Sequence, residues 1–189
     1  MHVEDAHLVE TLVSAETVFA GNLLHVRRDV VRTPSGREAS REVIEHPGAV
    51  AILVQDEQGR VCLVRQYRHA TGSVLVELPA GKLDRRPDGT TEEPLRAAQR
   101  ELAEECQLRA GTWHHLLDFY LAAGYSSEKM SLFRALDLAP VDGRPDDDEF
   151  LECVWWSADE AIAAVRGGQI VDSKTIIGLS FLLSGGWGG

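Results

Sequence analysis

The sequence predicts an α+β fold, in which helices pack on a mixed β-sheet and a small antiparallel β unit precedes that sheet. Strand-like apolar segments dominate the chain on both sides of a helical segment at residues 95–106. Two further helical segments, at residues 158–166 and 173–183, follow the last strand-like segment. This order of elements is typical of a mixed sheet with helices packed on it.

The first 47 residues are predicted to form a separate β unit. Residues 18–46 contain apolar and charged residues in partial alternation, interrupted by the turn-forming sequence TPSGRE. Such a unit is too small to be stable alone, so we expect it to pack on the rest of the chain or on a second subunit. Pro47 and Gly48 mark the boundary with a second domain, residues 48–189.

The second domain opens with segments typical of buried strands. Residues 49–67 contain two apolar runs separated by a glycine-containing turn, and residues 73–78 form a further strand that ends at Pro79. Three more strand-like segments come later, at residues 113–121, 129–138 and 150–156. These segments supply the strands of the expected sheet.

The helical segments have recognisable ends. Residues 95–106 consist largely of strong helix formers, and Pro94 fits the first turn of a helix. Ser157 and Glu160 have the spacing of a capping box, which predicts the start of the next helix.

Composition limits the possible classes of function. The 189-residue chain has 30 Asp and Glu against 19 Lys and Arg, and its net charge of −11 repels nucleic acid and anionic membranes. Its apolar runs are too short to span a bilayer, and no signal peptide is apparent. The three cysteines, Cys62, Cys106 and Cys153, are scattered and lack C-x-x-C spacing. They indicate reduced thiols in the cytoplasm rather than a disulfide framework or a zinc site.

Three glutamates stand together on the central helix. Glu101, Glu104 and Glu105 share one face, apart from the apolar stripe that includes Leu102. Like charges at these spacings repel by roughly a few tenths of a kcal/mol per pair, and a divalent cation could offset what Arg100 leaves unbalanced. For an isolated E-x-x-E-E segment, the ordinary interpretation is a solvated acidic face. The surrounding residues must decide between the two.

The residues around this helix resemble the Nudix box, whose pattern is G-x5-E-x7-R-E-U-x-E-E-x-G-U, where U is a bulky apolar residue. The matching positions are Gly81, Glu92, Arg100, Glu101, Leu102, Glu104, Glu105 and Leu108. The resemblance implies the Nudix fold, an α/β/α sandwich with a mixed sheet.

Two features of the sequence depart from the pattern of the Nudix box. Ten residues rather than five separate Gly81 from Glu92, and the additional ones fall in the turn-rich sequence DRRPDG, where added length should leave the helix intact. Gln107 stands where the box has glycine. If the helix ends there in a left-handed residue, the side chain adds about 1–2 kcal/mol of strain. Otherwise the helix runs on toward Gly111.

The resemblance also implies a metal site. Its expected ligands are Ala80, through the backbone carbonyl, and Glu101, Glu104 and Glu105. Hard oxygen ligands of this kind suit Mg²⁺, with Mn²⁺ as the alternative. Glu104 is also a candidate for a catalytic role, whereas Arg100 is expected to orient the carboxylates and Glu92 to pair with Arg100 rather than bind metal.

The flanking segments resemble the ADP-ribose pyrophosphatase subgroup. They are VRQYRH, ELPAGKLD, DFYLAAGYSSEKMSLF, REVIEHPGAVAI and DSKTIIGL, and they extend the resemblance over most of the chain. Ala123 departs from the subgroup, which usually has proline there. The resemblance implies that Arg68 contacts the diphosphate, that Arg41 reaches adenine across a homodimer, and that Glu128 lies near the terminal ribose. Arg65 and His69 could add positive charge nearby, with ordinary surface charge as the alternative, and for Arg41 the alternative is a salt bridge in a hairpin.

The implied reaction is Mg²⁺-dependent hydrolysis of ADP-ribose to AMP and ribose 5-phosphate by attack of a metal-activated water. A late acidic loop, RPDDDEF, offers Glu149 as general base or further ligand, with Asp147 as the next choice. Two alternatives stay open, namely another nucleotide sugar such as GDP-mannose, and a module that binds a nucleotide without cleaving it. The complete R-E-x-x-E-E set opposes the second alternative.

Overall fold

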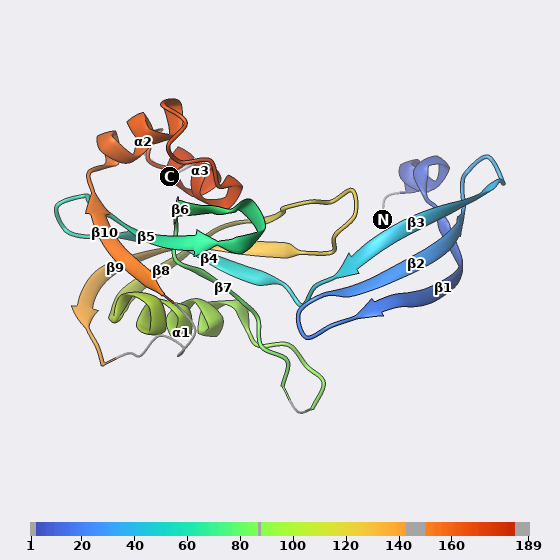
Figure 1. Ribbon diagram of the computed structural model, residues 1–189, viewed down its shortest axis with the longest axis horizontal. Helices are drawn as coiled ribbons and strands as arrows, with labels where there is room; N and C mark the ends of the chain where they lie inside the picture. Colours follow the sequence, from blue (N-terminus) through green and yellow to red (C-terminus); the bar gives the residue numbers. More distant parts are fainter. Residues whose placement is uncertain (1–2, 87, 143–149, 184–189) are drawn as a thin grey trace. The chain divides into compact units, whose positions relative to one another are not determined.

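The computed structural model of the protein describes residues 3–86, 88–142 and 150–183 in two compact units (Figure 1). Unit 1 contains the described residues up to Pro47 together with Tyr120–Lys129. Unit 2 contains Gly48–Phe119 and the described residues from Met130 onward. Nothing in the sequence indicates that Tyr120–Lys129 belongs with the N-terminal residues.

Unit 1 is a three-stranded antiparallel sheet. After the 3₁₀ helix η1 (Val3–Leu8), the strands β1 (Thr11–Ala20), β2 (His25–Arg32) and β3 (Glu38–Glu45) pair in the order β1-β2-β3. The predicted antiparallel β unit is therefore confirmed, although the sequence indicated no strand as early as residue 11. Every residue of β1 is exposed, so this strand lacks the alternation that marks a half-buried one.

The segment Tyr120–Lys129 joins unit 1 through the end of β3. The N–H of Ile44 donates to the carbonyl of Tyr125 at 2.7 Å, and the N–H of Ser127 donates to the carbonyl of Ile44 at 3.0 Å. These bonds satisfy both backbone groups of Ile44, which explains why the two segments group together.

Unit 2 is built on a seven-stranded mixed sheet. Its strands are β4 (Ala49–Gln55), β5 (Val61–Arg68), β6 (Ser73–Glu77), β7 (Ala80–Lys82), β8 (Leu108–Tyr120), β9 (Lys129–Pro140) and β10 (Leu151–Trp156). The main order is β10-β5-β4-β9-β8, with β6 paired to β5 and β7 paired to β4. Strand β4 is parallel to β9 and antiparallel to β5 and β7, which confirms the predicted mixed sheet.

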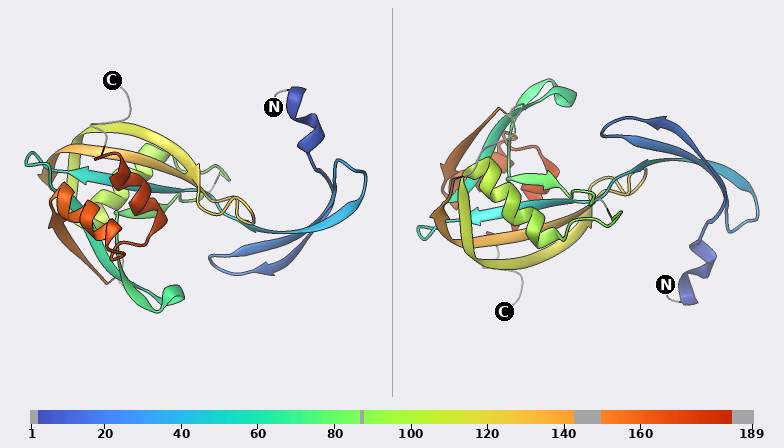
Figure 2. Two further views of the ribbon diagram at one scale, coloured as in Figure 1. Left: turned by 90° about the horizontal axis from the view of Figure 1, so that it is seen from above. Right: turned by 90° about the horizontal axis from the view of Figure 1, so that it is seen from below.

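Helices cover both faces of this sheet. Helix α1 (Pro94–Cys106) lies on one face, and α2 (Ala158–Arg166) and α3 (Ser173–Ser180) lie on the other (Figures 1 and 2). Strand β4 contacts both α1 and α3, so its run AVAILV is buried throughout. A Cβ at Gly178 would overlap the side chain of Leu78, so the glycine permits α3 to approach closely. These layers form the predicted α/β/α sandwich.

Helix α1 has defined ends. Glu93 caps its first turn by accepting from the N–H of Arg96 at 3.0 Å. The helix ends at Cys106, and Gln107 adopts the left-handed conformation with φ 55° while its N–H donates to Ala103 at 3.1 Å. The first of the two predicted endings is thus confirmed, and the inserted residues leave the helix uninterrupted.

Two further observations complete the fold. Ser157 and Glu160 form the predicted capping box at the start of α2, with the N–H of Ser157 donating to the Glu160 carboxylate at 2.8 Å. Among the helices of the described residues, none combines the length and the apolar character needed to cross a membrane.

Candidate active site

The three glutamates of helix α1 are buried to different degrees. Glu101 is 8% exposed and Glu105 is 6% exposed, whereas the side chain of Glu104 is 36% exposed. A solvated acidic face is therefore the wrong interpretation for Glu101 and Glu105. Buried carboxylates are rare unless cationic groups or hydrogen bonds compensate them, so the surroundings of both residues bear on function.

Strand β7 packs against the two buried glutamates, Glu101 and Glu105. The N–H of Ala80 donates to the carboxylate of Glu105 at 3.0 Å. A Cβ placed on Gly81 would overlap the carboxylate of Glu101. The Ala80-Gly81 pair thus provides both a donor and the space for the glutamate face, which gives a physical reason for glycine at this position.

Arg100 links the carboxylates to one another. Its Nη1 donates to Glu101 at 2.7 Å and to Glu104 at 2.9 Å, and its Nη2 donates to Glu92 at 3.0 Å and to the carbonyl of Lys82 at 3.2 Å. Burial alone would lower the pKa of Arg100, but the hydrogen bond to Glu92 and the charge of Glu101 raise it well above its usual range. Arg100 therefore stays charged and holds three carboxylates in fixed positions.

Glu92 binds Arg100 from outside helix α1. Its carboxylate accepts from Arg100 and, at 3.3 Å, from the backbone N–H of Asp84. Burial raises the pKa of Glu92, but these hydrogen bonds outweigh burial and hold the pKa below its ordinary value. Glu92 is thus ionised near neutral pH and anchors Arg100 rather than facing away from it.

The donor set fits a hard divalent cation. The one guanidinium of Arg100 binds the carboxylates of Glu92, Glu101 and Glu104, so this group carries more negative than positive charge. The carboxylate of Glu105 accepts from the N–H of Ala80 beside it. Carboxylate oxygens are the ligands that Mg²⁺ and Mn²⁺ prefer. The absence of a side chain at Gly81 lets the carboxylate of Glu101 lie directly against the backbone of β7.

A second charged cluster surrounds Glu77 at the end of β6. Arg68 donates to both oxygens of Glu77, at 2.8 and 2.9 Å, and Lys174 of α3 also donates to it. Burial raises the pKa of Glu77, which is 1% exposed, but Arg68 and Lys174 bring the pKa below its ordinary value. The same hydrogen bonds raise the pKa of Arg68, and the charge of Glu105 contributes to this rise.

This cluster changes the interpretation of Arg68. The sequence predicts a contact with a diphosphate, whereas the structure places the guanidinium on Glu77 with 41% of the side chain exposed. Glu77 and Lys174 were not identified from the sequence. Their only signals were a charged residue at the end of an apolar strand and a lysine in the first turn of the last helix.

Two further predicted residues, Arg41 and Glu128, lie in unit 1. Arg41 forms an ion pair with Glu10, with its Nε at 3.0 Å from the carboxylate, so the salt-bridge alternative describes this single chain. Glu128 lies with its carboxylate 4.0 Å from the ring of His46. Glu149 and Asp147 lie outside the described residues.

Comparison with known proteins places the chain in a family. Residues 45–176, more than half of the chain, match the model of the NUDIX domain. The chain belongs to the Nudix family. Residues 10–44 match the nucleoside diphosphate sugar hydrolase N-terminal domain, which corresponds to the three-stranded sheet of unit 1.

Two relatives and one solved structure are similar to this Nudix protein over most of its length. A protein of Mycobacterium tuberculosis called ADP-ribose pyrophosphatase is 42% identical over 92% of this chain and 82% of its own. A protein of Bacillus subtilis with the same name is 32% identical over 93% of both chains. The crystal structure of an ADP compounds hydrolase has a TM-score of 0.80, with 24% identity over 93% of this chain and 94% of that one, and it shows the shared fold.

Proposed function

We propose that this Nudix protein is a hydrolase that cleaves the diphosphate of ADP-ribose, releasing AMP and ribose 5-phosphate. The observation that carries the proposal is the buried pair Glu101 and Glu105 on α1, which lies against Gly81 and Ala80, with Arg100 bonded to Glu101. The two similar proteins called ADP-ribose pyrophosphatase support ADP-ribose as the substrate.

The glutamates of α1 would hold Mg²⁺, or Mn²⁺ in its place. Glu101, Glu104 and Glu105 supply carboxylate oxygens, and the carbonyl of Ala80 is the proposed backbone ligand. When bound, such an ion lowers the pKa of water and neutralises charge that develops on the diphosphate.

The protein's own groups would orient the reaction. Arg100 and Glu92 fix the carboxylates, because each hydrogen bond of Arg100 restricts one of them. Arg68 lies at the edge of the Glu77 cluster with an exposed portion that can meet an anionic substrate. In the reaction, the oxygen of water forms a bond to one phosphorus, and the bridging oxygen leaves with the other phosphate. The sequence predicts Glu149 or Asp147 as the group that accepts the proton.

Unit 1 is proposed to contribute to dimerisation and substrate recognition. Many of its large apolar side chains are exposed in the single chain, among them Leu8, Leu12, Val13, Val18, Phe19, Leu23 and Leu24. Exposed apolar side chains in this number favour burial against a partner, and a second copy of the chain is the proposed one. Arg41 would then reach the adenine of the substrate bound by the other copy.

The dimer has a direct test. Sedimentation velocity should give the mass of two chains, and replacing the exposed Phe19 with aspartate should shift the protein toward one chain. A wild-type protein that sediments as a single chain at micromolar concentration would exclude this part of the proposal. The three free cysteines support a reducing compartment, and we propose the cytoplasm.

The reaction is tested with purified protein, Mg²⁺ and a panel of dinucleotides and nucleotide sugars, with products separated by chromatography. ADP-ribose should give AMP and ribose 5-phosphate in equal amounts, faster than GDP-mannose is consumed. Faster turnover of GDP-mannose would refute the substrate, and binding without turnover of any member would refute the enzyme.

The residues are tested in the same assay. Glu105→Gln should lower kcat by at least about 100-fold, because several kcal/mol of charge stabilisation depend on the metal. Glu57→Gln, at an exposed position in the turn after β4, is the matched control and should leave kcat unchanged. Near-normal turnover by Glu105→Gln would contradict its role.

A further inference from the structure

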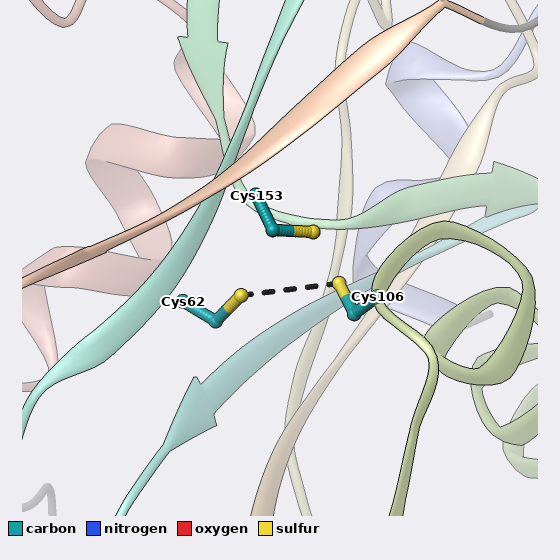
Figure 3. A group of neighbouring side chains, drawn as sticks. All are labelled: Cys62, Cys106 and Cys153. Atoms are coloured by element: carbon teal, nitrogen blue, oxygen red, sulfur yellow. Dashed lines mark hydrogen bonds between the residues drawn. The ribbon is translucent and has the colours of Figure 1, made fainter. Parts of the chain in front are cut away.

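Three cysteines far apart in the sequence meet in unit 2. Cys62 lies on β5, Cys106 is the last residue of α1, and Cys153 lies on β10. Their sulfur atoms all lie within 4.8 Å of one another, and the sulfurs of Cys62 and Cys106 are 3.9 Å apart (Figure 3). The lack of C-x-x-C spacing argued against a metal site. In the fold, however, the three sulfur atoms are close together although the residues are far apart in the sequence.

Strand register explains why the three side chains converge. Cys62 pairs with Trp155 across the antiparallel strands β5 and β10, and Cys153 lies two residues before Trp155. Residues two apart on a strand share a face, so Cys62 and Cys153 point to the same side of the sheet. Helix α1 contacts β10, and Cys106 and Trp155 pack against the buried cluster that contains Cys62. The turn at Gln107 then ends the helix directly beyond Cys106.

We propose that Cys62, Cys106 and Cys153 form a binding site for one thiophilic cation such as Zn²⁺, separate from the glutamates of α1. Tetrahedral zinc with Zn–S bonds of about 2.3 Å places two sulfur ligands about 3.8 Å apart. The observed separation of 3.9 Å between Cys62 and Cys106 meets this requirement, and the sulfur of Cys153 lies within 4.8 Å of both. Three protein ligands leave a fourth position, which water can fill.

Access distinguishes this cluster from ordinary core packing. Cysteine often packs in cores as a small apolar residue, and Cys62 is fully buried. Cys153 is exposed, however, so a cation can reach the sulfur atoms from solvent. The thiol of Cys153 donates to the carbonyl of Glu105 at 3.3 Å, and a bound cation would replace its proton.

The cysteine site and the glutamate site differ in the cations that they prefer. Thiolates select soft or borderline cations such as Zn²⁺ and Cd²⁺, whereas carboxylates select Mg²⁺ and Mn²⁺. The cysteine site does not depend on the proposed hydrolysis, and a protein that fails to cleave ADP-ribose would still bind its cation. Cd²⁺ is the suitable probe because bonds between cadmium and thiolate give a charge-transfer band in the ultraviolet.

The experiment titrates Cd²⁺ into the reduced, metal-free full-length protein. The charge-transfer band should saturate at one equivalent, and Zn²⁺ should displace the cadmium. Cys153→Ser should weaken binding by at least about tenfold and reduce the band, since one of three sulfur ligands is lost. Glu101→Gln, which alters only the carboxylate face, is the control and should keep the band.

Two outcomes would overturn the proposal. The first is no charge-transfer band in reduced wild-type protein, and the second is a band of unchanged intensity and affinity in Cys153→Ser. Because Cys153 is exposed, its replacement should preserve the fold, which circular dichroism checks. If that variant does not fold, Cys106→Ser provides the same test at the end of α1.

Discussion

Replacing Gly81 with alanine tests the glutamate face by adding a single methyl group. In the structure, the new Cβ would overlap the carboxylate of Glu101, so that side chain must move. Gly81 is not among the residues with positive φ, so alanine fits the backbone and the effect is steric. Overpacking of this kind costs about 1–3 kcal/mol of stability. For a chain of this size, that corresponds to a fall in Tm of about 2–12 °C.

The effect on activity should be larger than the effect on folding. A displacement of about 1 Å in a catalytic group can cost about 100-fold in rate, and Gly81→Ala should lower kcat by about that factor. Because a displaced Glu101 binds metal less well, the Mg²⁺ concentration at half-maximal rate should also rise. Initial rates of ADP-ribose hydrolysis over a series of Mg²⁺ concentrations measure both quantities.

A matched glycine provides the control. Gly167, at the end of α2, has right-handed backbone, and its added Cβ would come no closer than 3.3 Å to the Ala163 carbonyl. Gly167→Ala should retain the wild-type rate and Mg²⁺ dependence. If Gly81→Ala also behaves like wild type in both respects, the inference that β7 positions Glu101 is wrong.

Three other substitutions test the surroundings. Glu77→Gln removes the carboxylate that Arg68 and Lys174 share, leaving Lys174 only Asp172, and should lower stability at neutral pH by about 3 kcal/mol, measured by denaturant unfolding. Because the pKa of Glu77 is lowered in the folded protein, its stabilisation is present above the ordinary pKa and is lost as pH falls through the folded value. The stability of Glu77→Gln should therefore depend less on pH in acid, and an unchanged profile would refute this role. Gln107→Gly should raise stability by about 1 kcal/mol, because glycine adopts φ 55° without strain, and an unchanged or lower Tm would contradict that reasoning. Arg100→Lys cannot span the same carboxylates and should lower kcat by about 10–100-fold while raising the Mg²⁺ requirement. A lysine variant with normal Mg²⁺ dependence would show that the guanidinium geometry is dispensable.

The central helix and its glutamates were predictable because their signal is local. The strong helix formers, the proline in the first turn, and the glutamates Glu101 and Glu105 all lie within residues 94–106. Their burial was not predictable, because it depends on β7, which reaches them only in the fold. Position in a motif thus indicated which residues to consider, and packing determined their environment.

Contacts between distant residues account for most of what the sequence left unseen. Glu77 and Lys174 are 97 positions apart, and neither has a local pattern that indicates the other. The cysteine cluster depends on the register between β5 and β10, which the sequence of either strand does not specify alone. Strand β1 was missed for a different reason, since its residues are exposed and carry no alternation of burial.

Binding of Mn²⁺, followed by electron paramagnetic resonance, tests most directly whether the glutamates of α1 form the metal site. Wild type and Glu57→Gln should bind Mn²⁺ with the same affinity, and Glu105→Gln should bind it at least about tenfold more weakly. A Glu105→Gln protein that is folded and binds Mn²⁺ as tightly as wild type would contradict the assignment of the metal site to this helix.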